Sequence, residues 1–293
     1  MLRPGFTGSP LDRADRLRND PDAFMTAVSD WRARLLRLDG IDPVLGEDGR
    51  LSWGSLAEAD EGAELLLLGL IDGRPHFAAL DYGMPEGATR SMGIFRTLDV
   101  LPPEEASTYA GARSLIDWHL RHRFCAKCGN GDTVIHRAGW GRQCGRCGAE
   151  HFPRVDPVVI MLAEHDGKVL VGRQYRYPPG RYSALAGFVE PGESVEEAVA
   201  RELLEESGLK VRDVRYVVSQ PWPFPSSLML GCYAEAVSKD FQIDAQEIEQ
   251  ACWMTKAEVR ARLAGGIEDG IKLPGTVAIA RLLLADWVNT GDK

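Results

Sequence analysis

Four cysteines in two close pairs constrain this chain more than any other feature of its sequence. Two residues separate Cys125 from Cys128, and the same spacing recurs in Cys144 and Cys147 after fifteen intervening residues. Two tight turns of this kind present four thiolates to one tetrahedral ion, and this spacing is typical of a zinc ribbon. Because thiolates fill all four positions, no coordination position is left for a reactive water, and we expect the Zn²⁺ to be structural.

Basic side chains surround the cysteine pairs, although the whole chain is acidic. The chain has 34 basic and 43 acidic residues and a net charge of -9, which argues against a bulk electrostatic attraction to nucleic acid. A local basic patch on the ribbon is compatible with that balance, either as an RNA-binding face or, as we favour, as a solvated surface. Its residues are Arg121, Arg123, Lys127, Arg137, Arg142 and Arg146.

The sequence also indicates the cellular compartment in which the protein is expected. The longest apolar run, 65–71, is far shorter than the roughly 20 residues that span a bilayer. The first twenty residues contain no continuous apolar stretch of the secretory type, and the last three are no peroxisomal signal. Six cysteines are too few for a disulfide scaffold, and Cys232 and Cys252 are expected to be small buried hydrophobes. We therefore expect a cytoplasmic protein without a membrane partner.

Turn-forming residues organise the first part of the chain. Asp72-Gly73 separates two apolar runs within 64–80, which is typical of a β-hairpin. Pro102-Pro103 ends this pattern, and the residues after it predict a helix over 104–122. That helix leads into the cysteine pairs.

Strand and helix signals alternate after the last cysteine pair. A second hairpin is expected from 157 to 173, and strands are expected over 214–219 and 229–237. Thr255 with Glu258 predicts the cap of one late helix, and Pro274-Gly275-Thr276 is expected to open the last helix. We predict an N-terminal α+β domain over 1–120, a zinc ribbon over 121–153 and a further α/β domain over 154–293.

The segment from Gly187 to Leu209 contains a short helix with clear start and stop signals. Ser194 and Glu197 have the spacing of a capping box, and Gly208 suits the left-handed conformation that ends many helices. The helix is therefore expected over 194–207.

Acidic side chains cluster on this helix. Glu202, Glu205 and Glu206 are spaced i, i+3 and i+4, so all three are expected to project from one face. The carboxylates repel one another, and Arg201 offsets this only in part through its i+4 partner Glu205. A hard divalent cation would relieve the repulsion. By spacing alone, a solvated acidic face explains the cluster equally well.

The residues around the cluster resemble the signature of the Nudix hydrolases at every position. That signature is filled here by Gly187, Glu193, Arg201-Glu202-Leu203, Glu205-Glu206 and Gly208-Leu209. The resemblance implies an α/β/α sandwich in which this loop–helix–loop binds Mg²⁺ or Mn²⁺ and a diphosphate linked to another moiety. Metal ions suit that reaction because they neutralise phosphate oxygens and lower the pKa of bound water.

A second motif is similar to one branch of that family, the NADH pyrophosphatases of the NudC type. Residues 219–227 read SQPWPFPSS, and in that branch a four-cysteine ribbon also precedes the Nudix domain. Three prolines hold Trp222 and Phe224 on a stiff segment, which predicts an aromatic wall for a nucleotide, with a rigid hydrophobic loop as the alternative. The resemblance covers Arg121 to the C-terminus well and the first hundred residues only in layout. The substrate-binding residues it implies in this motif are Gln220, Pro221, Trp222, Pro223, Phe224, Pro225, Ser226 and Ser227.

Carried over by position, the resemblance also implies a catalytic metal site. Glu202, Glu206 and the carbonyl of Ala186 would bind the divalent ion, together with Glu247, for which Glu249 is a near competitor. Glu205 lies in the same cluster, and either Glu205 or Glu206 would act as the base. Glu193 and Arg201 complete the catalytic set that the signature implies.

The same resemblance implies further contacts with the substrate. Phe152 and Phe188 match the pair that sandwiches a nucleobase, although plain core packing is the alternative for both. Ala278 matches a backbone contact to the substrate. A homodimer is also expected, in which the two phenylalanines would come from different subunits.

These inferences predict a metal-dependent pyrophosphohydrolase that cleaves NADH, and NAD⁺, to nicotinamide mononucleotide and AMP. Removal of NAD caps from RNA 5′ ends would follow, because the scissile bond is the same. The enzymatic alternative is a Nudix hydrolase of ADP-ribose or other nucleoside diphosphate derivatives. The non-enzymatic alternative, a zinc-ribbon RNA-binding or nucleotide-sensing regulator, usually has a decayed signature, whereas no signature glutamate is missing here.

Overall fold

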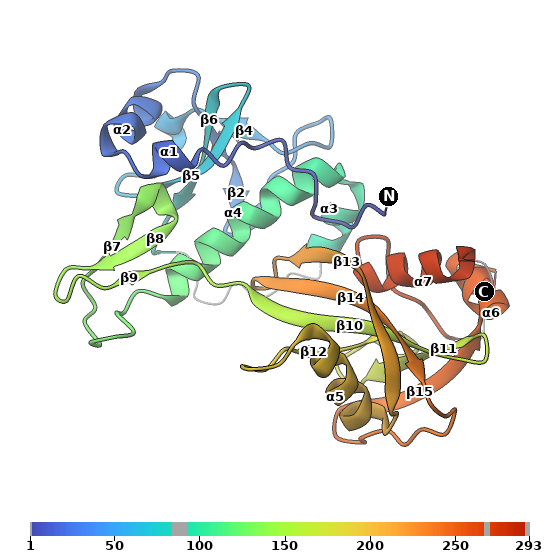
Figure 1. Ribbon diagram of the computed structural model, residues 1–293. Helices are drawn as coiled ribbons and strands as arrows, with labels where there is room; N and C mark the ends of the chain where they lie inside the picture. The colour runs from blue at the N-terminus through green and yellow to red at the C-terminus, as the bar shows by residue number, and fades with distance from the viewer. Residues whose placement is uncertain (1, 84–92, 267–269, 291–293) are drawn as a thin grey trace. The chain divides into compact units, whose positions relative to one another are not determined.

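A computed structural model describes residues 2–83, 93–266 and 270–290 of the chain (Figure 1). The chain divides into two compact units. The first, here called the N-terminal unit, comprises residues 6–155 and 222–226. The second, here called the C-terminal unit, comprises residues 1–5, 156–221 and 227–293. The segment Trp222–Ser226 of the proline-rich motif thus belongs to the N-terminal unit.

The N-terminal unit contains a four-stranded sheet with the order β4-β1-β6-β5. The predicted hairpin is confirmed, because β5 and β6 pair in antiparallel fashion around Asp72 and Gly73. Both turn residues have positive φ, as the tightest hairpin turns require. Strand β1 pairs in parallel with β6, and β4 pairs with β1 in antiparallel fashion. The strands are β1 (Arg34–Leu36), β4 (Trp53–Gly54), β5 (Glu64–Ile71) and β6 (Arg74–Leu80).

The long helix α4 (Pro103–Arg121) confirms the helix predicted after the proline pair. Pro103 stands at its first turn, where the missing N–H costs nothing, and the helix buries Tyr109 and Ile116 completely. The other short elements of this part are α1 (Asp15–Arg18), α2 (Pro21–Ser29), β2 (Leu38–Asp39), β3 (Asp42–Pro43), η1 (Leu56–Glu58) and α3 (Ile94–Val100).

The cysteine pairs lie on a small three-stranded sheet with the order β7-β8-β9. Cys144 is the last residue of β8 and pairs with Thr133 of β7, which brings the second cysteine pair beside the strand that follows the first. The elements are β7 (Thr133–His136), η2 (Arg137–Gly139), β8 (Gly141–Cys144) and β9 (Glu150–His151).

The C-terminal unit is built on a six-stranded mixed sheet with the order β13-β14-β10-β11-β15, to which β12 adds by pairing with β10. The predicted second hairpin is confirmed by β10 and β11, and β10 also pairs in parallel with β14 over nine residue pairs. The strands are β10 (Asp156–His165), β11 (Lys168–Gln174), β12 (Leu185–Phe188), β13 (Val211–Trp222), β14 (Ser227–Ala236) and β15 (Ile248–Thr255).

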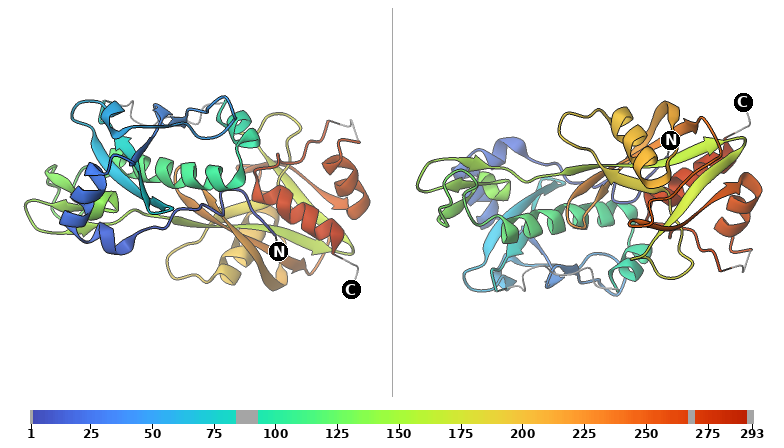
Figure 2. Two further views of the ribbon diagram at one scale, coloured as in Figure 1. Left: turned by 90° about the horizontal axis from the view of Figure 1, so that it is seen from above. Right: turned by 90° about the horizontal axis from the view of Figure 1, so that it is seen from below.

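Helices cover both faces of this sheet, so the unit is an α/β/α sandwich, as expected (Figure 1, Figure 2). Side chains alternate along β10: Val159 and Met161 share a core with α5 (Val195–Ser207), while Ile160 and Leu162 share a core with α7 (Ile279–Asn289). Helix α6 (Lys256–Leu263) follows β15 and begins at the predicted capping box of Thr255 with Glu258.

The last helix begins later than the sequence predicts. Pro274 was expected to open it, but α7 starts at Ile279, and Ala278 before it has an extended backbone with φ -82 and ψ 133. The cause is the side chain of Gln220, which binds the peptide groups on both sides of Ala278 and so keeps that residue out of the helix. In the parts of the chain that the structure describes, no helix has the length and apolar character needed to span a membrane.

Candidate active site and zinc site

Helix α5 is fixed at both ends by the signals read from the sequence. The Ser194 hydroxyl accepts from the Glu197 N–H, and the Glu197 carboxylate accepts in return from the Ser194 N–H at 2.7 Å. Gly208 has φ 68 and ends the helix in the left-handed conformation. The capping box and the glycine stop are therefore confirmed, and the acidic cluster stands on a helix with a defined register.

Arg201 forms hydrogen bonds with three of the acidic side chains of the signature. Its guanidinium donates to Glu193 at 2.6 and 2.9 Å, and to Glu202 and Glu205 at 2.9 Å each. A further bond reaches the carbonyl of Phe188 at 2.8 Å. The hydrogen bonds from Arg201 lower the pKa of Glu193 to about 2, while the carboxylates raise the pKa of Arg201. Arg201 thus links the loop before α5 to the helix itself.

Glu206 is the buried carboxylate of the cluster. It is 2% exposed, and its Oε2 atom has no hydrogen-bond partner among the described residues. Burial, followed by the charges of Glu202 and Glu247, raises its pKa to about 8, against a backbone hydrogen bond from Ala186. Burial also raises the pKa of Glu202, and Glu205 and Glu247 add to that shift.

The donor set of this cluster fits a hard divalent cation. The charges of Glu202 and Glu247 help to raise the pKa of Glu206, that of Glu247 helps to raise the pKa of Glu202, and Glu206 Oε2 has no hydrogen-bond partner among the described residues. Carboxylate oxygens are the ligands that Mg²⁺ and Mn²⁺ prefer, and a cation among them would remove the cost of burying their charge.

Gly187 owes its place in the signature to the Glu202 carboxylate. A Cβ atom at residue 187 would overlap the carboxyl group of Glu202, so that group in its present position needs the space that a glycine leaves free. The backbone of β12 and the carboxylates of α5 therefore lie side by side, with Ala186 next to the cluster.

Glu205 and Glu249 differ from the buried Glu206 in their exposure and in their partners. The side chain of Glu205 is 59% exposed and pairs with Arg201. It lies one residue, or about 100° of helix rotation, from Glu206, so it stands at the edge of the site. Glu249 forms an ion pair with the buried Arg173, whereas Glu247 interacts with Glu202 and Glu206. Glu247 thus interacts electrostatically with the cluster, while Glu249 is engaged by Arg173.

Gln220 of the proline-rich motif is completely buried in the C-terminal unit. Its amide nitrogen donates to the carbonyl of Val277 at 2.8 Å and to that of Gly5 at 3.1 Å. Its amide oxygen accepts from the N–H of Ile279 at 2.9 Å. Gln220 therefore holds the backbone on both sides of Ala278, a residue that was itself expected to contact the substrate.

The aromatic side chains of the motif lie in the N-terminal unit. Trp222 and Phe224 are half-buried, with ring centroids 5.3 Å apart, and both pack against Phe95 at 6.1 and 5.6 Å. Phe6 contacts both rings edge-on. Two of the prolines, Pro221 and Pro225, are exposed, and Pro223 is buried. The last two motif residues are serines. The Ser226 hydroxyl donates to the carbonyl of Arg154 at 3.0 Å, and Ser227 is the first residue of β14.

Phe152 and Phe188 belong to different units, and each is exposed, at 46% and 61%. This exposure does not suit the plain core packing that was the alternative for both. Within the N-terminal unit, the Arg137 guanidinium lies 5.6 Å from the centroid of the Phe152 ring.

The four paired cysteines converge as the sequence predicts. Their sulfur atoms all lie within 4.8 Å of one another, and the Cys125–Cys147 and Cys128–Cys144 distances are both 3.7 Å. A tetrahedral ion with bonds of about 2.3 Å needs sulfur separations of about 3.8 Å, so the site fits zinc. His151 Nε2 lies 3.3 Å from the Cys125 sulfur, a contact that the spacing did not suggest.

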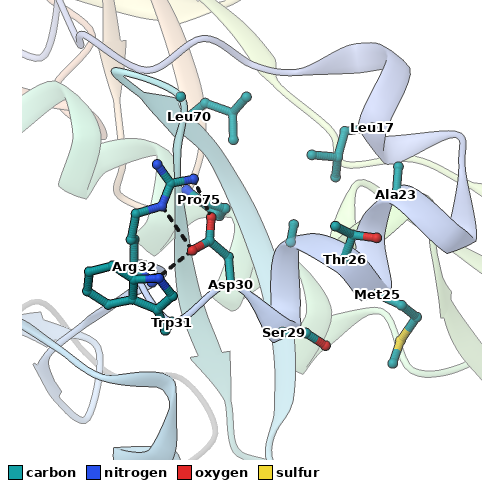
Figure 3. A pocket seen from close by; sticks show the side chains of 12 residues that line it. Leu17, Ala23, Met25, Thr26, Ser29, Asp30, Trp31, Arg32, Leu70 and Pro75 are labelled. Atoms are coloured by element: carbon teal, nitrogen blue, oxygen red, sulfur yellow. Dashed lines mark hydrogen bonds and ion pairs between the residues drawn. The ribbon is translucent and has the colours of Figure 1, made fainter.

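A surface hollow of roughly 1210 Å³ lies elsewhere in the N-terminal unit, beside α2 and the β5–β6 hairpin (Figure 3). Met25, Trp31 and Leu70 line it, and its Asp30 and Arg32 are paired with each other at 2.7 Å. Among the described residues that line it there is no cluster of metal ligands and no unpaired acid, so we do not place the active site there.

Two known domain families match this chain. Residues 153–272 match the model of the NUDIX domain, and residues 120–152 match that of the NADH pyrophosphatase zinc ribbon domain. Among solved structures, a NUDIX hydrolase from Nitrosomonas europaea is similar with a TM-score of 0.42 and 25% identity, covering 46% of this chain and 79% of that one.

The chain is also similar to curated proteins from bacteria and from humans. The chain is 42% identical over 295 residues to a protein of Mycobacterium tuberculosis H37Rv named NAD-capped RNA hydrolase NudC, which covers 94% of this chain and 92% of that one. The human NAD-capped RNA hydrolase NUDT12 is 48% identical over 198 residues, covering 64% of this chain and 43% of the human protein.

Proposed function

We propose that this chain, which belongs to the Nudix hydrolases and within them to the NudC family, hydrolyses the diphosphate of NADH and NAD⁺. The products would be nicotinamide mononucleotide and AMP. The same cleavage would remove NAD caps from RNA 5′ ends, as the names of the mycobacterial and human relatives suggest. The observation that carries this proposal is the complete signature folded around a buried carboxylate, Glu206, one oxygen of which has no partner among residues 2–83, 93–266 and 270–290.

We propose that Glu202, Glu206, Glu247 and the carbonyl of Ala186 hold Mg²⁺ or Mn²⁺ in this site. When bound, such ions neutralise phosphate charge and make bound water more acidic. The protein's own contribution is to place the carboxylates before the substrate arrives. Gly187 gives Glu202 its space, and Arg201 with Glu193 fixes the loop against the helix. This arrangement supplies the preorganised electrostatics that phosphoryl chemistry needs.

For the general base we propose Glu205 rather than Glu206. Glu206 is buried among other carboxylates, which suits a ligand, whereas Glu205 is exposed enough to meet water and is oriented by Arg201. The pair of variants Glu205→Gln and Glu206→Gln separates these roles. Both should lose most turnover, but only Glu206→Gln should also weaken the binding of Mn²⁺, measured by calorimetry. Equal loss of Mn²⁺ binding in both variants would contradict the assignment.

We further propose that Trp222, Phe224, Phe152, Phe188 and the backbone of Ala278 contact the nucleotide. The exposure of the two phenylalanines supports this, since rings left in water are available for stacking on a base. A homodimer and the three-domain division at residues 120 and 153 also remain proposals. Sedimentation of the purified chain measures the first.

One experiment tests the proposed reaction. The purified protein is mixed with Mn²⁺ in ¹⁸O-labelled water and given NADH, NAD-capped RNA or ADP-ribose, and the products are identified by mass. We expect nicotinamide mononucleotide and AMP, with one labelled oxygen on the phosphate that was attacked. Hydrolysis of ADP-ribose with no cleavage of NADH would instead support the alternative nucleoside diphosphate substrates.

A further inference from the structure

Arg113 is a buried cation on α4 that contacts the aromatic segment of the proline-rich motif, residues 222–226. It is 4% exposed, and its Nε donates to the carbonyl of Pro223 at 2.9 Å. Its guanidinium carbon lies 4.8 Å from the centroid of the Phe224 ring, within the range of a cation–π contact. One side chain thus binds both the backbone and a ring of this segment.

The other side of the Arg113 guanidinium is bound by the N-terminal unit itself. Nη1 donates to the carbonyl of Ile41 at 3.3 Å and lies 3.4 Å from the Tyr109 hydroxyl and 3.5 Å from Asp42. Tyr109, in turn, donates to the carbonyl of Ile41 at 2.9 Å. A buried guanidinium with partners on both sides has little freedom to move, so it can hold the segment that it contacts in one position.

Ser114, the next residue of α4, makes a second contact of the same kind. Its hydroxyl donates to the carbonyl of Pro225 at 3.1 Å. A proline has no N–H, so its backbone can be held only through its carbonyl. Two neighbouring residues of α4 therefore hold the carbonyls of the two prolines that flank Phe224.

The contacts continue from Phe224 to Trp222. The two rings meet edge-on, with an interplanar angle of 69°, and both pack against Phe95. A shift of Phe224 would therefore displace Trp222 as well. No spacing in the sequence indicates this role for Arg113, which lies 110 residues before its partner Pro223.

We propose that Arg113, assisted by Ser114, is a positioning residue that fixes Trp222 and Phe224 for nucleotide binding. This inference rests on the proposed function, and it gives helix α4 of the N-terminal unit a part in substrate affinity. Without Arg113 the segment must be ordered when the nucleotide binds, and the cost of that ordering reduces affinity rather than the rate of the chemical step.

The test compares Arg113→Gln, Arg113→Lys and Ser114→Ala with a matched control, Arg37→Gln. Arg37 lies in the same unit but in an exposed ion pair with Glu58. The protein is labelled with 5-fluorotryptophan, and the ¹⁹F signal of Trp222 is assigned from Trp222→Phe. KM and kcat for NADH are then measured with saturating Mn²⁺.

We expect Arg113→Gln to shift or broaden the Trp222 signal in the absence of substrate. KM for NADH should rise about tenfold, with kcat changed by less than about threefold. Arg113→Lys, which keeps the charge, should recover part of the loss, and Ser114→Ala should show a smaller effect of the same kind. The Mn²⁺ concentration for half-maximal rate should be unchanged in all of them.

An unchanged Trp222 signal in both Arg113→Gln and Ser114→Ala would overturn the proposal, whatever their activity. The proposal would also be overturned if Arg113→Gln shifted the Trp222 signal but had the same KM for NADH as the Arg37→Gln control. The position of Trp222 would then not govern the affinity for NADH. If Arg113→Gln does not fold, the decision rests on Arg113→Lys and Ser114→Ala by the same two criteria. A parent protein that cleaves no NADH or NAD⁺ would refute the proposed function, while the ¹⁹F signal would still report on the position of Trp222.

Discussion

At the scale of single residues, Gln220 shows that a motif residue can stabilise the fold although it is buried and cannot reach a substrate. Replacing it with methionine keeps the volume but leaves the carbonyl of Val277 and the N–H of Ile279 without their present partner. Each buried polar group left unpaired costs about 1–3 kcal/mol, so we expect the free energy of unfolding to fall by about 2 kcal/mol or more. Urea denaturation measures this, with the exposed Gln246→Met as the control. A loss no larger than that of the control would contradict the role given to Gln220.

The buried side chain of His119 should make the stability of the fold depend on pH. It is completely buried, donates from Nε2 to the carbonyl of Gly139 at 2.7 Å and lies 3.1 Å from Arg142 through Nδ1. Burial, with smaller contributions from Arg142 and His122, lowers its pKa to about 4. The unfolded chain therefore binds a proton at higher pH than the folded chain does, and stability is lost as the pH falls from about 6.5 towards 4.

The magnitude follows from that difference in pKa. Between pH 7 and pH 5, the His119 titration should lower the free energy of unfolding by about 2 kcal/mol. His119→Gln removes this group, so the variant should be less stable than the parent at pH 7 but should lose less on acidification. Urea denaturation of both proteins at the two pH values gives the comparison. Parallel losses in parent and variant would show that His119 does not titrate in this range.

The zinc ligands could be predicted from spacing, whereas the carboxylate site needed the resemblance to the Nudix signature, and the environments of the residues in both sites could not be predicted. Four thiolates at fixed spacing have few other uses, which is why the zinc ligands were found. Helix periodicity separates Glu205 from Glu206 by about 100° of rotation, but only the packing around α5 decides that Glu206 is buried and Glu205 exposed. Arg142, which the sequence placed in a basic patch, is likewise buried, and it contacts Tyr82 and His119, which lie 60 and 23 positions away in the chain.

At the scale of elements, the approach of β12 to α5 depends on Gly187. An alanine there would overlap the Glu202 carboxylate, so Gly187→Ala must displace either the strand or the side chain. Because a shift of about 1 Å in a catalytic group can cost about a hundredfold in rate, we expect kcat/KM for NADH to fall by about that factor, with the fold retained. The control is Gly266→Ala, where the added Cβ would lie 3.4 Å from its nearest neighbour, the carbonyl oxygen of Ala261. Full activity in Gly187→Ala would show that Glu202 tolerates displacement.

Elements defined by local signals were predicted well, and elements defined by distant contacts were not. The two Asp-Gly hairpins, the capping boxes of α5 and α6 and the proline at the start of α4 all act within a few residues of where they are read. The parallel pairing of β1 with β6 joins residues some forty positions apart, and no local pattern indicates it. The late start of α7 has the same cause, since Gln220 acts on it across 59 positions.

At the scale of the whole molecule, the zinc site should govern the stability of one part of the chain without governing the chemistry of the other. Within the described residues 120–152 few apolar side chains besides Cys125 and Cys144 are buried, so the free energy of zinc binding is in large part the folding free energy of this segment. The carboxylate cluster lies entirely in the C-terminal unit, on a sheet with two apolar cores. Loss of zinc should therefore unfold residues 120–152 locally and leave that cluster in place.

Cys144→Ser tests this separation, because Cys144 ends β8 and is one of the two buried ligands. Elemental analysis should find one zinc per chain in the parent and a marked loss in the variant. Hydrogen exchange should then rise in peptides from the ribbon and stay unchanged in peptides from α5 and β10. The Mn²⁺ concentration for half-maximal rate should also be unchanged, since none of its proposed ligands belongs to the ribbon. A variant that loses zinc yet keeps the parent's exchange in the ribbon would show that the fold of this segment does not depend on the ion.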